Sequence, residues 1–157
     1  MTLTKDRSFT FAIDKLDRDE TLQQVAAASA LARQQRVVVV PEVDSYVYGV
    51  MCTKAGTKAE AVGLTKDNIY TEVLKGSEAL DNALVPDTGR VLVVTPAVYT
   101  LMKLAPDIIM DSDIGQDMRI KGVISMLDGL AVVRVPAARL PEKFGFMVPH
   151  PCATVAP

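Results

Sequence analysis

The chain has 157 residues, 49% of them apolar, and its 17 basic and 19 acidic side chains give a net charge of −2. This length allows one domain, or one domain with an appendage, around a substantial core. The charge balance argues against a dedicated nucleic-acid-binding protein, and the sequence has no apolar run approaching the roughly 20 residues that span a bilayer.

The N-terminal third predicts a strand followed by two helices. Apolar and polar side chains alternate over residues 8–13, as they do in a half-exposed strand. Residues 20–36 are rich in alanine and predict a helix whose narrow apolar stripe implies that it lies across a surface or packs on a partner chain. Pro41 suits the first position of a second helix, which extends to Met51. Residues 52–63 are small and polar, which predicts a mobile loop.

The next segment predicts a third helix. Thr65 is a suitable N-cap for a helix over residues 66–85, where apolar side chains keep helical spacing. Gly76 lies inside this helix and weakens it by about 1 kcal/mol relative to alanine.

A short apolar strand and a helix come next. Residues 91–94 are all apolar, which is typical of a strand buried on both faces. Thr95 and Pro96 then suit the N-cap and the first position of a helix that ends before Pro106. Residues 107–121 mix acidic and apolar side chains without a clear period.

The last elements predict a hairpin and a final strand. Two apolar runs, residues 123–127 and 130–135, flank Asp128 and Gly129, a dipeptide typical of a type I′ turn. The run at residues 144–148 predicts one more strand. Together the elements predict an α/β (α+β) fold with a mixed central sheet and flanking helices.

Catalytic chemistry has little support in the sequence. His150 is the single histidine, and Cys152 is too close to it in sequence to face it across a site. The sequence contains no nucleophile elbow, dinucleotide-binding motif or phosphate-binding loop. Cys52 and Cys152 are isolated and residues 1–15 lack a secretory pattern, so we expect an intracellular protein without a disulfide or a zinc site. We therefore expect no catalytic residue, no cofactor and no enzymatic activity.

Four acidic residues form a suggestive cluster, at Asp107, Asp111, Asp113 and Asp117. Asp111 and Asp113 resemble the start of a calcium-binding loop, but Gly122 stands where the closing glutamate should be. The cluster is better interpreted as a solvated acidic loop, and we expect no metal site.

Two other groups of side chains have structural interpretations. The basic pairs are too few for a nucleic-acid-binding stripe and are interpreted as solvating charges: Lys5 with Arg7, and Lys54 with Lys58. Tyr46 and Tyr48 point to different sides of the predicted helix, which favours packing in a core or an interface.

Four segments together resemble the major capsid proteins of tailed phages, which have the Hong Kong 97-type fold. They are SFTFAIDKLDRDET at residues 8–21, PEVDSYVYGVM at 41–51, GRVLVVTPAVYTLMK at 89–103 and GVISMLDGLAVVRVPAARLPEKFGFMVPHP at 122–151. The most specific feature is the strand and Thr-Pro helix followed by the Asp-Gly hairpin. With the helix around residues 69–84, the resemblance covers most of the chain.

The resemblance implies a division of the chain. Residues 1–42 would be a peripheral-domain strand and spine helix, residues 43–136 the axial domain at the centre of a capsomer, and residues 137–157 a return segment to the peripheral domain. The loop at residues 52–63, the acidic segment at 107–117, or both would lie towards the capsomer axis. The family's N-terminal arm, extended loop and further peripheral strands have no counterpart here, so we expect a fragment whose final strand lacks an evident partner.

A structural role follows from the resemblance. The parent protein would be a subunit of a phage or prophage icosahedral capsid, assembled in the bacterial cytoplasm from copies of itself. The resulting virion would enclose packaged DNA, which the coat protein would not bind in a sequence-specific way. No membrane partner is expected. Encapsulin-type compartment shells share the fold and are the alternative. A small α/β enzyme or ligand-binding module is a further alternative, because a fold does not determine a function.

Overall fold

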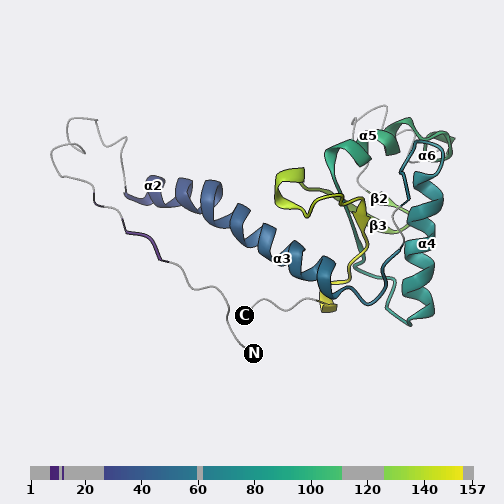
Figure 1. Ribbon diagram of the computed structural model, residues 1–157, viewed down its shortest axis with the longest axis horizontal. Helices are drawn as coiled ribbons and strands as arrows, with labels where there is room; N and C mark the ends of the chain where they lie inside the picture. Colours follow the sequence, from purple (N-terminus) through teal and green to yellow (C-terminus); the bar gives the residue numbers. More distant parts are fainter. Residues whose placement is uncertain (1–7, 11, 13–26, 60–61, 111–125, 154–157) are drawn as a thin grey trace. The chain divides into compact units, whose positions relative to one another are not determined.

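The computed structural model describes residues 8–10, 12, 27–59, 62–110 and 126–153 (Figure 1). The chain divides into two units, Met1–Glu42 and Val43–Pro157. The described elements combine helices with a four-stranded mixed sheet, which confirms the predicted α/β (α+β) class.

Three helical elements follow one another without a break: α2 (Ala27–Gln34), η1 (Gln35–Val39) and α3 (Val40–Lys54). The helix predicted over residues 41–51 is found as α3, but it begins at Val40 and continues directly from η1, so Pro41 does not start it. The intervening η1 is a turn of π-helix, in which the Val40 N–H donates to the Gln35 carbonyl. So wide a turn relieves the clash that a proline ring makes with the carbonyl four residues earlier, and Pro41 therefore lies within the helix.

The predicted strand over residues 8–13 is not found at the positions that the structure describes. Residues 8–10 and 12 have no regular secondary structure, and Phe9 is 43% exposed. Alternation of apolar and polar side chains favours a strand only where a neighbouring strand completes its hydrogen bonds. The described strands all belong to one sheet between Val91 and Met147.

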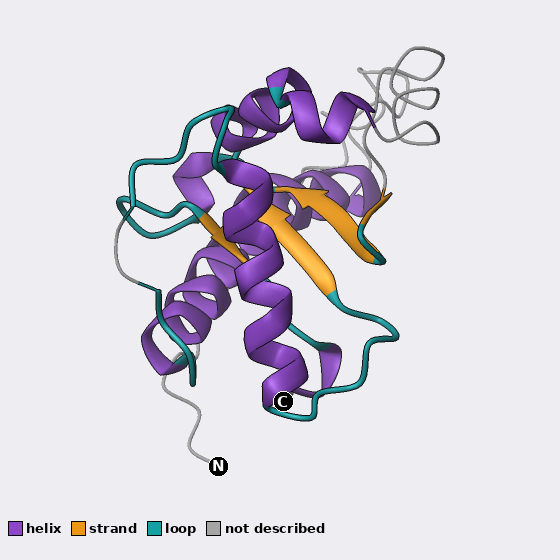
Figure 2. Cartoon of the chain, turned by 90° about the vertical axis from the view of Figure 1, so that its right-hand side faces the viewer, coloured by secondary structure: helices purple, strands orange, loops and turns teal. Residues whose placement is uncertain are grey.

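This sheet has the strand order β2-β3-β1-β4, and Figure 2 shows its strands in orange. The strands are β1 (Val91–Val94), β2 (Met126–Leu127), β3 (Leu130–Arg134) and β4 (Phe146–Met147). β1 runs parallel to β3, with Leu92 opposite Val132, and antiparallel to β4, with Val93 opposite Met147. The final strand therefore has a partner, contrary to the expectation from sequence, and it completes the pairing of β1 on both edges.

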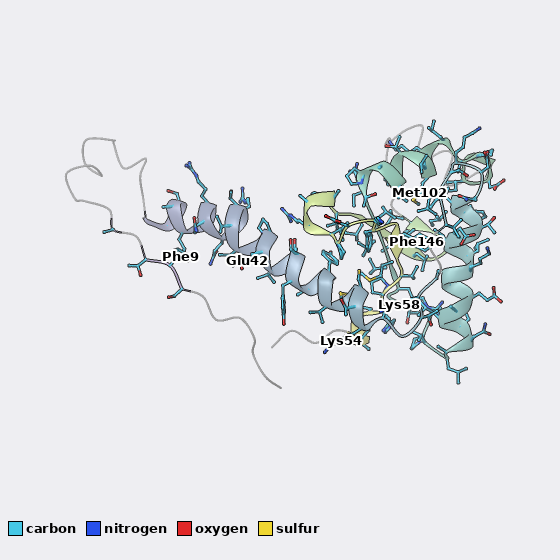
Figure 3. All side chains as sticks on the ribbon, viewed as in Figure 1. Phe9, Glu42, Lys54, Lys58, Met102 and Phe146 are labelled. Carbon is cyan, nitrogen blue, oxygen red and sulfur yellow. The ribbon has the colours of Figure 1, made fainter. Side chains whose placement is uncertain are left out.

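β1 lies at the centre of the core. Leu92, Val93 and Val94 are at most 3% exposed, as predicted for a strand buried on both faces. Three helices, α4 (Ile69–Asn82), α5 (Pro96–Leu104) and α6 (Pro106–Met110), pack with the hairpin around it. The core side chains that they add are Ile69, Val73, Val98, Tyr99, Met102, Ala105, Ile108, Leu127 and Leu130; Figure 3 labels Met102 and Phe146, which packs against this core.

Two local predictions are confirmed in full. Oγ1 of Thr95 accepts a hydrogen bond from the Val98 N–H at 3.3 Å, so Thr95 caps α5 and Pro96 occupies the first turn. Asp128 and Gly129 have φ values of 49° and 75°. Positive φ at both central residues is the signature of a type I′ turn, which joins β2 to β3.

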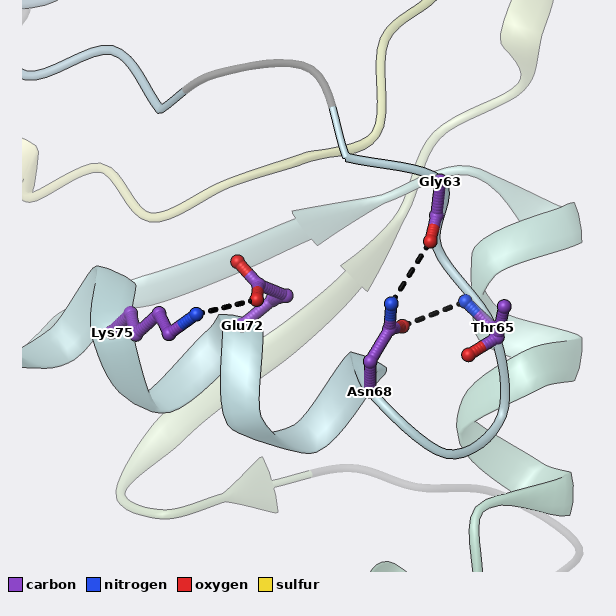
Figure 4. A network of polar contacts seen from close by, with 5 residues as sticks. All are labelled: Gly63, Thr65, Asn68, Glu72 and Lys75. Atoms are coloured by element: carbon purple, nitrogen blue, oxygen red, sulfur yellow. Dashed lines mark hydrogen bonds and ion pairs between the residues drawn. The ribbon is translucent and has the colours of Figure 1, made fainter.

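The start of α4 differs from the prediction. The helix begins at Ile69, and Asn68 precedes it. Thr65 contributes its backbone carbonyl, which accepts from the Ile69 N–H at 3.1 Å. The Asn68 amide instead ties the approaching chain together, because Oδ1 accepts from the Thr65 N–H at 2.7 Å and Nδ2 donates to the Gly63 carbonyl at 2.9 Å (Figure 4).

The predicted loop at residues 52–63 begins later than expected, because α3 continues to Lys54. Nζ of Lys58 donates to the Thr53 carbonyl at 2.6 Å. A lysine that binds one of the last carbonyls of a helix satisfies an acceptor that has no partner within the helix. This contact explains why the helix extends into the polar segment.

Candidate interaction surface

His150 is held by backbone groups on both sides of its ring. Nε2 donates to the Thr88 carbonyl at 3.2 Å, and Nδ1 accepts from the Cys152 N–H at 3.2 Å. The ring thus joins the C-terminal segment to the turn before β1. Both nitrogens that could act as a base are engaged in this link, which favours a structural role for His150.

The two cysteines differ in environment. Cys152 is exposed, whereas Cys52 is partly buried on α3. Burial raises the pKa of the Cys52 thiol, and the positive charge of Lys58 opposes this shift. A raised pKa disfavours the thiolate, so Cys52 lacks the activation that a nucleophilic cysteine needs.

The acidic cluster falls mostly outside the described residues. Asp107 lies in the first turn of α6, while Asp111, Asp113 and Asp117 are not among the residues described. Lys5 and Arg7 also lie outside them. Within the described part of the chain, no three His, Cys, Asp or Glu side chains gather in an arrangement that could hold a metal ion.

One side of α3 is bound to the segment between β3 and β4. Nη1 of Arg139, in the 3-10 turn η2 (Ala137–Arg139), lies 2.8 Å from Oδ2 of Asp44. Tyr48 is partly buried beside this pair. Burial is the main cause that raises the pKa of Tyr48, the Asp44 charge adds to it, and the Arg139 charge opposes it. The ion pair joins α3 to η2 within the unit Val43–Pro157, and Tyr48 is partly buried near it.

Another side of α3 presents an open, mostly apolar patch formed by Ser45, Tyr46, Gly49, Val50, Thr53 and Lys54. A Cβ atom built at Gly49 would meet no atom within 4 Å, so the patch is open at this point. This patch on α3 is the first part of a candidate interaction surface.

The turn between α4 and β1 is the second part. Arg90 is only 5% exposed, and its guanidinium lies 2.7 Å from Oδ1 of Asp81. The same side chain donates to the carbonyls of Val85 and Pro86. Arg90 therefore clamps this turn from within. The sequence patterns do not single out Arg90. The one feature that could have indicated its role is a single arginine directly before an otherwise apolar strand.

Leu84 lies at the tip of the clamped turn. Its side chain is 91% exposed, and its φ of 56° lies in the left-handed region. Other large apolar side chains are exposed in the second unit at Val43, Tyr46, Val62, Leu74, Leu104, Met126 and Val133. Exposed apolar surface of this kind marks candidate contacts with other chains.

A solved structure from Mycobacterium phage Che8 has a similar fold, with a TM-score of 0.66 over 90% of this chain and a sequence identity of 20%. The present chain spans 52% of the length of that phage chain. No protein-family model matches the sequence, and no curated protein is similar to it. None of the helices among the described residues is long and apolar enough to span a membrane. The likeness shows that this chain shares its fold with a phage protein.

Proposed function

We propose that this chain is part of a coat protein of the Hong Kong 97 type, whose copies assemble into the icosahedral capsid of a phage or prophage. The observation that carries the proposal is the fold shared with a Mycobacterium phage Che8 chain over 90% of the present sequence. The resemblance implies a spine helix within residues 1–42 and a mixed sheet with a hairpin; helix α2 (Ala27–Gln34) and the sheet β2-β3-β1-β4 are consistent with these elements.

The surface chemistry supports an assembling role. Large apolar side chains are exposed on α3, on the α4–β1 turn and on the hairpin strands. Each lasting contact between subunits buries on the order of 1,200–2,000 Å², and such contacts need apolar anchors. The net charge of −2 suits a shell that encloses DNA without reading its sequence.

The proposal is tested by expressing the complete gene product from the source genome and examining it by electron microscopy. Closed particles of uniform size are expected, and particles released after prophage induction should contain DNA. A complete product that stays monomeric at high concentration would contradict the proposal. Particles filled with a protein cargo instead of DNA would favour the compartment-shell alternative. The 157-residue chain by itself is expected to form monomers or small oligomers.

A further inference from the structure

The sheet carries different side chains at its two ends. β1 and β3 run parallel, with Val91 opposite Ala131 and Val94 opposite Arg134. The α4–β1 turn and the hairpin turn therefore lie at one end of these strands, the amino end, and Arg134 lies at the other, the carboxyl end. A single copy of the chain thus presents two distinct surfaces at opposite ends of the same sheet.

The amino end presents an apolar side chain on a fixed turn. Leu84 is 91% exposed, and its φ of 56° is a conformation that glycine usually adopts at the end of a helix. Arg90 holds this turn from within, through Asp81 and the carbonyls of Val85 and Pro86. A side chain that is already held in place loses little conformational entropy on binding. Leu84 is therefore well suited to anchor a contact.

Two exposed carboxylates at the amino end are available for a partner. Asp87 lies on the clamped turn, and Asp128 lies in the hairpin turn, which the Ala131 N–H joins to the Arg90 carbonyl at 3.2 Å. Neither carboxylate has an ion pair or a hydrogen bond among the described residues, whereas Asp81 is bound by Arg90. The charge that remains available at this end is therefore negative.

The carboxyl end presents an arginine that is already oriented. Cζ of Arg134 lies 4.6 Å from the centre of the Tyr99 ring, and Tyr99 is only 4% exposed. Stacking of this kind uses the flat face of a guanidinium and leaves the N–H groups on its edge to bind a carboxylate. Arg134 itself is exposed and has no hydrogen bond or ion pair within the described part of the chain. It is therefore suited to bind a carboxylate from outside the chain.

The charges around Arg134 keep this end positive. Nζ of Lys103 lies 5.4 Å from the centre of the same Tyr99 ring. Glu142 and Lys143 precede β4 at the carboxyl end, and their adjacent charges offset each other. A positive carboxyl end and a negative amino end attract each other and orient an encounter between two copies.

We propose that the amino end of the sheet in one copy docks on the carboxyl end of the sheet in a second copy of this chain. Asp87 of the first copy binds Arg134 of the second, and Leu84 is buried beside this pair. The contact is heterologous, since different surfaces of the two copies meet, and repeated contacts of this kind close into a ring or extend as a filament. This proposal rests on the proposed function, because a capsomer is a ring of copies, and it assigns the chemistry of one contact within that assembly.

Charge reversal tests the pair by sedimentation velocity of the 157-residue chain, at concentrations up to about 1 mM. Asp87→Arg and Arg134→Glu should each weaken self-association at least about tenfold, because like charges then meet. A chain that carries both substitutions should associate within about threefold of the native chain, because opposite charges meet again. A double variant that associates no better than the single variants would overturn the proposal.

Two controls separate a specific pair from a change in net charge. Glu78→Arg reverses an exposed acidic residue on α4, and Arg33→Glu reverses an exposed basic residue on α2. Each should change self-association by less than about twofold. Raising NaCl from about 0.05 M to about 0.5 M should weaken association of the native chain, whereas a purely apolar contact would keep its strength or gain.

Cross-linking locates the contact without changing the charged pair, so it decides the proposal even where Arg134→Glu lowers stability. Both native cysteines are replaced by alanine, and one variant carries Thr88→Cys while the other carries Pro136→Cys, at exposed positions near Asp87 and Arg134. A short thiol cross-linker should join the two variants when they are mixed, and neither variant alone should form more than background dimer. A mixture that cross-links no better than each variant alone would overturn the proposal.

The remaining outcomes separate this contact from the proposed function. Equal association of the native and Asp87→Arg chains, or a native chain that stays monomeric throughout, would overturn the contact. Weaker binding of duplex DNA by Arg134→Glu with unchanged self-association would assign Arg134 to DNA and also overturn it. Particles formed by the complete gene product despite Asp87→Arg would leave the capsid proposal intact and exclude the contact. A complete product that forms no particles with its native residues would instead contradict the proposed function.

Discussion

Replacing Gly129 by valine isolates the energy of one backbone conformation. Gly129 has a φ of 75° and stands between Leu127 and Leu130, whose side chains are 1% and 2% exposed. A Cβ atom built at Gly129 meets no atom within 4 Å, so the substitution creates no clash with neighbouring residues. What remains is the strain of a β-branched residue at positive φ, which we expect to cost roughly 1–3 kcal/mol.

Urea denaturation followed by circular dichroism measures this loss. For a chain of this size, 1 kcal/mol lowers the melting temperature by about 2–4 °C, so the variant should melt about 2–12 °C below the native chain. The matched control is Gly56→Val, because Gly56 also has open space around it and no left-handed φ. The control should stay within about 0.5 kcal/mol of the native chain. Equal midpoints for Gly129→Val and the native chain would refute the type I′ assignment.

Five further substitutions test other parts of the structure. Gly76→Ala should stabilise the chain by up to about 1 kcal/mol in thermal melts, because the new Cβ would lie in ordinary contact, 3.4 Å from side chains of the β4 segment. Gly76→Leu should destabilise it by about 1–3 kcal/mol by displacing those side chains; equal stability would mean that the helix and strand are not in close contact. Oγ of Ser77 is buried without a hydrogen-bond partner in the described structure, so Ser77→Ala should keep or raise the urea midpoint, and a clear drop would reveal a missed partner. Arg90→Met should cost about 1–3 kcal/mol in urea denaturation, since carbonyls of the α4–β1 turn lose their donor; no change would show that the clamp contributes nothing. The pKa of Cys52 is raised from its ordinary value of 9.0, so its contribution to stability is complete below that pH and is lost as pH rises above it. Native stability should therefore fall more between pH 8 and pH 10 than that of a Cys52→Ala variant, and parallel profiles would contradict the shift.

Predictions that depend on a few consecutive residues succeed. Thr95 and Pro96 start α5 because the capping bond spans three residues and proline needs no N–H donor at that position. Asp128 and Gly129 form the turn because they adopt positive φ at low cost. Residues 91–94 form a buried strand because four apolar side chains in a row leave no face for water. For the cap and the turn the favourable energy comes from within the segment, so the sequence alone determines the local structure. For β1 the sequence indicates only that the segment avoids water, and its pairing with β3 and β4 completes the strand.

The tertiary structure decides what depends on distant residues. β4 has a partner because Met147 lies opposite Val93, although more than fifty residues separate them in sequence. The candidate interaction surface also escapes sequence reasoning. The exposure of Leu84, for example, follows from a turn that Arg90 clamps from within. Sequence patterns predict which side chains avoid water, but only the packed chain shows which of them remain exposed, because burial depends on contacts between segments that the sequence does not place side by side.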